Sequence, residues 1–433
     1  MVRLRALALI SAVAACGGDR GAPAAGGGSG SGSAPAPVTA AATAPSAKAA
    51  ELVGGDGHGH GHGHELPRSL IGTCAAASVD EPSDEGRLGL LLDEAGRQLE
   101  AQAWADAFTC ADMAADLAPR SIEAHHLRAA ILAGAGHDER AAVAYGLALA
   151  LDPEDPETLR ATADFYINVT RARSRDTTAL GLELARRGFA RATARRRGQS
   201  DLRARLALLE AQAWNDLDRA DEALERASEA VRLSSELVDA VHERGVALFN
   251  LGRFAEARGQ FERVLTALPD DAFAHHLMGL TLEQLGERQR AEDHLARART
   301  LAPDEFPPAV EITAAQMRAE IDRVLASLAP ARAAQVRQVS IVVADLPDPA
   351  DLRAVSPPFP PTILGLFRGL PLGTEPAPGE DVPERAILLY RLNLARAVRS
   401  RDELSQQIER TLLHEIGHLE GLDEDDLRRR DLE

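Results

Sequence analysis

Aromatic residues are scarce in this chain of 433 residues: phenylalanine, tryptophan and tyrosine together make up 3% of it, although 45% of the residues are hydrophobic. Alanine, leucine and arginine dominate instead, and all three have high helix propensity. The composition therefore favours a mainly α-helical protein. The chain is also too long for a single compact core, so we expect two or three domains and a tail.

Net positive charge is also lacking, since the formal net charge is −18 and the isoelectric point is near 5.2. Nucleic-acid binding depends on clustered Lys and Arg that neutralise phosphates, so no nucleic-acid partner is expected. Long apolar runs are missing too, because no stretch approaches the roughly 20 apolar residues that cross a bilayer. Any attachment to a membrane would have to come from a lipid anchor.

The N-terminus has the layout of an export signal. Arg3 and Arg5 precede a short apolar stretch over residues 6–15, which is followed by Cys16 and two glycines. This order of charge, apolar residues and small residues is typical of a secretory signal. Residues 13–16, Val-Ala-Ala-Cys, resemble the bacterial lipobox, which implies removal of residues 1–15 and lipidation of Cys16. We therefore expect an exported protein, lipid-anchored in the bacterial cell envelope at the periplasmic or outer-membrane face; the alternative is a frayed end with a chance cysteine.

Only three cysteines occur in the chain, and two of them remain if Cys16 carries lipid. Cys74 and Cys110 would then lie in a compartment that permits disulfides. They either pair with each other or remain two small buried thiols, and the sequence leaves both possibilities open.

Residues 16–85 are expected to form a flexible tether, because glycine, alanine, serine and proline dominate up to residue 66 and leave little apolar surface to bury. Within it, His58, His60, His62 and His64 alternate with glycine. Several imidazoles so close together are able to bind Zn²⁺, Ni²⁺ or Cu²⁺ loosely. The tract is either a metal scavenger or a linker indifferent to metal.

Residues 86–305 contain a repeat with a period of 34. Small residues, glycines and a closing proline recur at this spacing, as Ala240, Gly245, Gly252, Ala257 and Pro269 do at Ala274, Gly279, Gly286, Ala291 and Pro303. A unit of this length, with a turn at Gly252 or Gly286, resembles the tetratricopeptide repeat (TPR), here in about six copies. The resemblance implies a helical solenoid whose groove binds a protein or peptide partner, although a purely structural role is the alternative.

Histidine recurs at one equivalent position of three repeats. His126, His242 and His276 each lie on the first helix of a pair, where side chains that line the groove are usually found. The alternatives are a groove sensitive to pH or metal and a set of ordinary surface histidines.

The period stops after Pro303, and residues 306–433 are expected to form a small α+β domain. Apolar spacing predicts a helix over residues 309–328. Two short β-branched or apolar runs, residues 339–344 and 386–390, predict strands. The proline- and glycine-rich residues 356–379 between them are interpreted as a long loop.

A last helix should run from near Asp402, with Asp402 or Ser405 as its cap, to His418. His414 and His418 are four residues apart, so both imidazoles leave the same helix face and are able to bind one metal ion. Two histidines and a third ligand leave a Zn²⁺ position open for water, and Glu415 is placed to accept a proton from it.

The third zinc ligand is expected in the acidic run after the helix. Gly421 is able to take a positive φ and turn the chain sharply. Glu424 is six residues after His418, where the metzincin pattern has its third ligand. Glu424 is therefore our first choice and Asp425 the second.

Residues 306–426 resemble the minimal zincin family of bacterial zinc metallopeptidases, small domains with a short sheet packed on helices. The matching stretches are residues 339–347, 363–372, 386–391 and 411–418. The resemblance implies bound Zn²⁺ and hydrolysis of a peptide substrate, with His414, His418 and Glu424 as ligands and Glu415 as catalytic base. The alternative is a non-catalytic TPR adaptor with a structural metal site.

Overall fold

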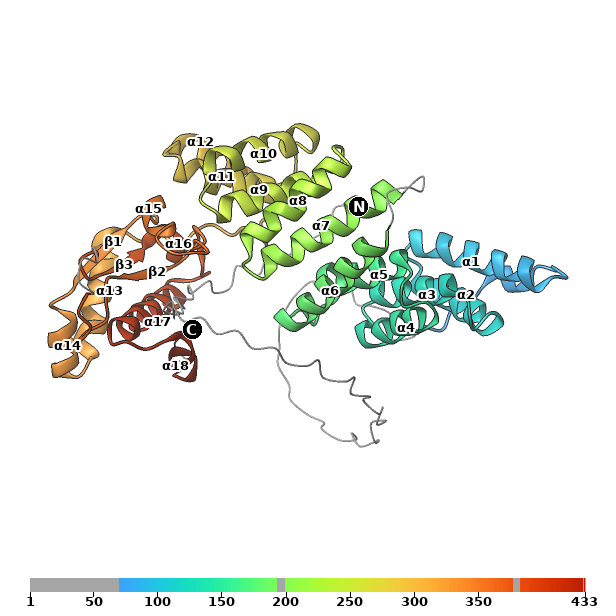
Figure 1. Ribbon diagram of the computed structural model, residues 1–433, viewed down its shortest axis with the longest axis horizontal. Coiled ribbons are helices and arrows are strands. Elements are labelled where there is room, and N and C mark those ends of the chain that lie inside the picture. Colours follow the sequence, from blue (N-terminus) through green and yellow to red (C-terminus); the bar gives the residue numbers. More distant parts are fainter. Residues whose placement is uncertain (1–69, 193–198, 377–381, 431, 433) are drawn as a thin grey trace, which may run out of the picture. The chain divides into compact units, whose positions relative to one another are not determined.

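The computed structural model describes residues 70–192, 199–376, 382–430 and 432 (Figure 1). Cys16, the predicted signal sequence and the tract from His58 to His64 lie outside these residues. None of the helices in the described part of the chain combines the length and the hydropathy of a membrane span.

The protein is mainly α-helical, as predicted, and its described residues begin with helices that pack in antiparallel pairs (Figure 1). A short helix, η1 (Ala75–Ser78), precedes them. The pairs are α1 (Asp84–Glu100) with α2 (Trp104–Leu117), α3 (Ile122–Gly134) with α4 (Asp138–Leu151), α5 (Pro156–Asp164) and its extension η2 (Phe165–Val169) with α6 (Arg175–Arg191), α7 (Gln199–Asp216) with α8 (Ala220–Leu233), α9 (Val238–Asn250) with α10 (Phe254–Ala267), and α11 (Ala272–Gln284) with α12 (Arg288–Leu301).

The glycines of the repeat have two separate roles. Gly252 and Gly286 have φ values of +66° and +79°, which form the turns predicted between paired helices. Gly245 and Gly279 instead lie where two helices cross. A Cβ on Gly245 would stand 2.7 Å from Phe261 Cε1, and one on Gly279 would stand 2.6 Å from Leu295 Cγ. The 34-residue spacing of small residues therefore reflects close helix packing.

Cys74 and Cys110 form a disulfide with a Cα–Cα distance of 5.1 Å. Both residues are buried in the core of the first two helix pairs. The bond joins the segment before α1 to the middle of α2, and it decides between the two possibilities that the sequence left open.

A small α+β part follows the repeats. Its elements are α13 (Ala314–Ser327), α14 (Pro330–Val336), β1 (Ser340–Ala344), α15 (Pro349–Leu352), β2 (Gly365–Arg368), β3 (Ala386–Tyr390), α16 (Arg391–Arg396), α17 (Arg401–Leu419) and α18 (Glu424–Arg429). The strands have the order β1-β3-β2, with β1 parallel and β2 antiparallel to the central β3.

All five residues of β3 are buried, because both faces of the sheet are covered. Ile387 and Leu389 belong to a hydrophobic cluster with residues of α13, α16 and α17. The alternate residues Leu388 and Tyr390 belong to a second cluster, which includes apolar side chains of α9 to α12. An ion pair joins the same regions, since Arg396 Nη1 lies 2.8 Å from Glu283 Oε2.

Three predictions about this part need correction. The predicted helix over residues 309–328 begins only at Ala314, because Thr313 and Gln316 form a capping box. The interval 356–379 is not entirely loop, since it contains β2. The last helix does begin near Asp402, at Arg401, but its cap is Ser400 and not Asp402 or Ser405, because the side chain of Ser400 accepts a hydrogen bond from the Glu403 amide. Both strands predicted from apolar runs are confirmed, as β1 and β3.

Candidate metal centre

The two histidines of the predicted site lie on the last turns of α17 and are almost fully buried. His414 is 1% exposed and His418 is 8% exposed. Their Nε2 atoms are 2.9 Å apart, which the four-residue spacing on a helix allows because both side chains leave the same face. Both imidazoles therefore present one nitrogen to the same point in space.

The second nitrogen of each ring faces a backbone carbonyl. His414 Nδ1 lies 2.9 Å from the carbonyl oxygen of Leu432, and His418 Nδ1 lies 3.1 Å from that of Leu422. A carbonyl accepts only, so each Nδ1 carries a proton and donates it. Each Nε2 is then the nitrogen that faces a cation, which is the usual arrangement of histidine ligands to metals.

A tight turn after α17 places Glu424 at the same point. Gly421 has a φ of +86°, and the amides of Gly421 and Leu422 donate to the carbonyls of His418 and Gly417. These two bonds form a Schellman motif. Asp423 then caps α18 by accepting a hydrogen bond from the amide of Asp426, so Glu424 is the first residue of that helix.

Glu424 completes a group of three potential ligands. Its Oε1 atom lies 3.2 Å from His418 Nε2 and 3.8 Å from His414 Nε2. The three ligand atoms lie within 4.8 Å of one another. Asp425, the second choice from the sequence, is an exposed residue that forms an ion pair with Arg428. The structure thus brings together the first-choice set and leaves Asp425 outside it.

Glu415 is buried beside this group, against the edge strand β2. It is 4% exposed, and its carboxylate accepts a hydrogen bond from the Phe367 amide. Burial raises the pKa of Glu415 to about 7, an effect that the neighbouring His418 and the Phe367 amide oppose. A carboxyl group with this pKa is able both to take and to release a proton near neutral pH.

Charge on the carboxylates also affects His418. Burial alone would lower the pKa of His418, but Glu424 and Glu415 favour the protonated ring and raise the pKa above its usual value. In the absence of a cation, the proton on His418 therefore partly compensates the two carboxylates.

The donor set fits Zn²⁺. Two imidazole nitrogens and one carboxylate oxygen are a common catalytic zinc set, and such a set leaves a fourth position for water or substrate. The carbonyl contacts of both Nδ1 atoms leave the two Nε2 atoms to bind zinc, which would displace any proton that they carry. Glu415 lies on the same helix but is not among the three potential ligands.

Some residues that shape the site were not identified from the sequence. A Cβ on Gly365 would stand 2.9 Å from Glu415 Oε1 and 2.8 Å from Thr411 Cγ2, so only glycine lets β2 approach the helix this closely. The carbonyls of Leu422 and Leu432 carry no side-chain signal that sequence patterns detect. Gly365 did lie within a stretch that matched the family, next to the apolar residues of β2.

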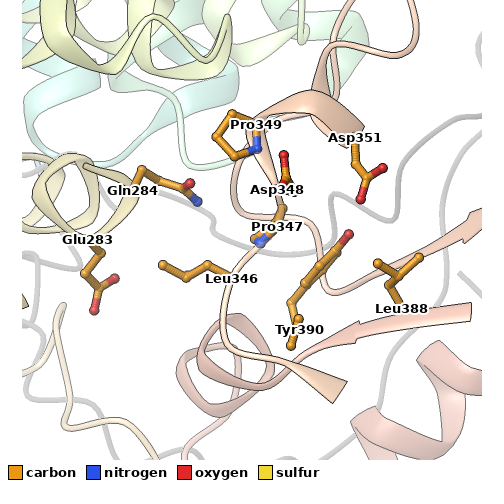
Figure 2. A pocket seen from close by; sticks show the side chains of 10 residues that line it. Glu283, Gln284, Leu346, Pro347, Asp348, Pro349, Asp351, Leu388 and Tyr390 are labelled. Atoms are coloured by element: carbon orange, nitrogen blue, oxygen red, sulfur yellow. The ribbon is translucent and has the colours of Figure 1, made fainter. Parts of the chain in front are cut away.

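A hollow in this part lies away from the metal centre. A cavity of about 370 Å³ opens between the end of α11 and the β1–α15 segment, and Figure 2 shows Tyr390 between Pro347 and Leu388 in its wall. No hydrogen-bond partner for the Tyr390 hydroxyl is found in the described part of the chain. None of the three potential metal ligands lines this cavity, so it is separate from the metal centre.

Comparison with known families is consistent with this geometry. Residues 336–433 match the family model described as "Zincin-like metallopeptidase". The match covers the sheet, α17 and α18, and it does not extend to the repeats. No curated protein matches the chain.

Solved structures similar to this chain contain helical repeats. YrrB, titled a TPR protein with an unusual peptide-binding site, is 21% identical over 45% of this chain and 93% of its own, with a TM-score of 0.35. PilF of Pseudomonas aeruginosa is 15% identical over 52% and 96%, with a TM-score of 0.44. PilW, a type IV pilus biogenesis factor, is 16% identical over 51% and 96%, also with a TM-score of 0.44.

Proposed function

We propose that this protein is a zinc-dependent metallopeptidase of the bacterial cell envelope. His414, His418 and Glu424 would hold Zn²⁺, and Glu415 would act as the general base. The observation that carries the proposal is the position of Glu415, which is buried beside the ligand group at the edge strand β2. A purely structural metal site needs no further ionisable group there. Burying an additional carboxyl group is unfavourable, so its presence indicates a role in the reaction.

The proposed reaction is hydrolysis of a peptide bond. When bound, zinc supplies Lewis acidity that activates water and polarises the substrate carbonyl. Glu415 removes a proton from the attacking water and transfers it to the leaving amine nitrogen, which a group with a pKa of about 7 is suited to do. The Phe367 amide keeps the Glu415 carboxylate oriented during both transfers.

The repeats would bind a protein or peptide partner. Stacked helix pairs provide extended surfaces for such binding. Exposed apolar side chains also form a stripe on α4, where Val143, Leu147 and Leu151 are 63%, 42% and 37% exposed at four-residue spacing. Contiguous exposed apolar side chains are typical of interaction sites. Charged substitutions at Val143 and Leu147 should therefore weaken partner capture without affecting zinc content.

Export and lipidation are part of the proposal. The lipobox-like residues 13–16 support lipidation of Cys16. The disulfide between Cys74 and Cys110 supports an oxidising compartment, because such bonds persist outside the cytosol. Metabolic labelling with a radioactive fatty acid, compared between the native chain and Cys16→Ala, tests this point.

The decisive experiment measures zinc content and cleavage of an unbiased peptide library in the same preparations. Glu415→Gln should retain zinc and lose cleavage by a factor of at least about 100. Glu409→Gln, a substitution at a partly exposed position of the same helix, is the matched control and should retain both. Cleavage that persists in Glu415→Gln would contradict the proposed base, and zinc without any cleavage by the native chain would favour the adaptor.

A further inference from the structure

A second pair of histidines lies on the last helix pair of the repeats. His275 is on α11 and His294 is on α12, and both are half-buried. Their Nδ1 atoms are 2.9 Å apart, and the ring centroids are 5.0 Å apart. Two antiparallel helices therefore direct one imidazole nitrogen each to a common point near the surface.

The protonation state of His275 follows from its other contact. His275 Nε2 lies 2.9 Å from the carbonyl oxygen of Pro269, so this nitrogen carries the proton of the neutral ring and donates it. His275 Nδ1 is consequently a bare lone pair. Without a metal, it accepts a hydrogen bond from His294 Nδ1. His294 supplies a second lone pair once its proton moves to Nε2, a change of tautomer that leaves the ring neutral.

The α3–α4 pair provides an internal comparison. His125 occupies the same helix position as His275, and its Nε2 also lies 2.9 Å from a proline carbonyl, that of Pro119. Ala144 is nineteen residues after His125, as His294 is after His275. His125 Nδ1 is buried and has no hydrogen-bond partner among the described residues. Both helix pairs thus have a histidine that is hydrogen-bonded to a proline carbonyl. Of these two pairs, only α11–α12 has a second histidine opposite the first.

The separation of the two nitrogens allows both to bind one ion. At a metal–nitrogen distance of about 2.0–2.1 Å, two ligand atoms 2.9 Å apart subtend an angle of roughly 90° at the metal. Such an angle is compatible with several divalent ions, and among these Cu²⁺ binds imidazole nitrogens more tightly than Zn²⁺ does. No third His, Cys, Asp or Glu joins the pair into a larger group in the described part of the chain, so water would complete the coordination.

Charges of both signs lie near the pair. Arg290 disfavours a positive charge on His294, and Asp293 favours one. The imidazoles are therefore the main determinant of affinity, and bound water at the remaining positions keeps the affinity well below that of a three-ligand site.

We propose that His275 and His294 form a second metal site, selective for Cu²⁺ over Zn²⁺, on the repeat domain. This site is separate from the zinc centre and does not depend on the proposed peptidase activity. The two histidines would act as a chelating pair, in which each ring strengthens the binding of the other by holding the ion in place.

Residue-resolved labelling of the full chain tests the site, because other histidines also bind metal. Diethyl pyrocarbonate modifies accessible neutral imidazoles, and mass spectrometry locates each modified peptide. In the native chain, Cu²⁺ should protect His294 at a concentration at least about tenfold lower than in His275→Ala or His275→Gln, as expected for loss of one ligand. Zn²⁺ should protect it less well than Cu²⁺.

His294→Ala is the matched variant, because Ala144 occupies the equivalent position in the α3–α4 pair. It should retain the thermal stability of the native chain and bind one Cu²⁺ fewer by calorimetric titration. The proposal is overturned if His294 is protected equally in the native chain and in the two His275 variants. An unchanged Cu²⁺ stoichiometry in His294→Ala would also overturn it.

Discussion

Gly417 lies directly beneath Leu427, since a Cβ on Gly417 would stand 2.4 Å from Leu427 Cδ2. Gly417 is on α17 between the two ligand histidines, and Leu427 is the buried residue of α18. The absence of a side chain at Gly417 therefore allows α18 to pack close to α17. This packing holds Glu424 near His418.

Gly417→Ala should weaken zinc binding. The added methyl group displaces Leu427, so α18 shifts and moves Glu424 away from the histidines. We expect the zinc dissociation constant to rise about tenfold or more, as for other supports of metal ligands. Competition with a chromophoric chelator measures the change. Gly259→Ala is the control, since a Cβ there meets no atom within 4 Å and alanine favours the helix. Equal affinity in both variants would show that the position of α18 does not matter.

Gly365→Ala should separate catalysis from zinc binding. Its Cβ would collide with Glu415 Oε1, and the collision displaces the proposed base without touching a ligand. We expect kcat to fall by a factor of about 10–100 with one zinc retained. A variant that lost zinc and activity together would instead indicate a general disruption of the sheet against α17.

His276 should make stability dependent on pH. It stacks on Phe306, and burial together with Arg396 and Arg299 lowers the pKa of His276 to about 3. The folded pKa lies below the unfolded value, so this stability is present above about pH 6.5 and is lost as the pH falls towards 3. Between pH 7 and pH 5 the native chain should lose about 2 kcal/mol more than His276→Gln. Urea unfolding of both chains at the two pH values measures this difference, and parallel losses would contradict it.

Removal of the disulfide should loosen the first helix pair. The bond closes a loop with a sequence separation of 36. The double substitution Cys74→Ser, Cys110→Ser should lower the local stability by about 4 kcal/mol. Hydrogen exchange should accelerate in α1 and α2 and remain unchanged in α11 and α12. Equal acceleration throughout would indicate that the repeats unfold as one unit.

The fold was largely predictable because its signals are periodic. The 34-residue spacing located the helix pairs, and the turns at Gly252 and Gly286 followed from it. The four-residue β2 was missed, because prolines and glycines around it are typical of loops and its stability comes from pairing with β3. The Ser400 cap was missed because Asp402 and Ser405 are equally good capping residues locally.

The parts of the site that depend on helical spacing and on turn residues were predictable. His414 and His418 must share a face of α17, and Gly421 must turn the chain before Glu424. Gly365 contacts α17, which is distant in the sequence, and the contact of Gly417 depends on the exact packing of α18. Local sequence patterns therefore predict neither contact. The histidines of the repeats show the same limit, because His126 and His242 pack edge-on against Tyr145 and Phe261, an arrangement that the period alone does not reveal.

The disulfide also determines how mechanical force enters the repeats. Cys74 precedes α1 and is bonded to Cys110 in α2, so all of α1 lies within the closed loop. Tension pulling on the chain from its N-terminal side passes through the sulfur atoms directly into α2. It therefore does not peel α1 away one turn at a time, and the first helix pair bears load as a single covalently closed unit.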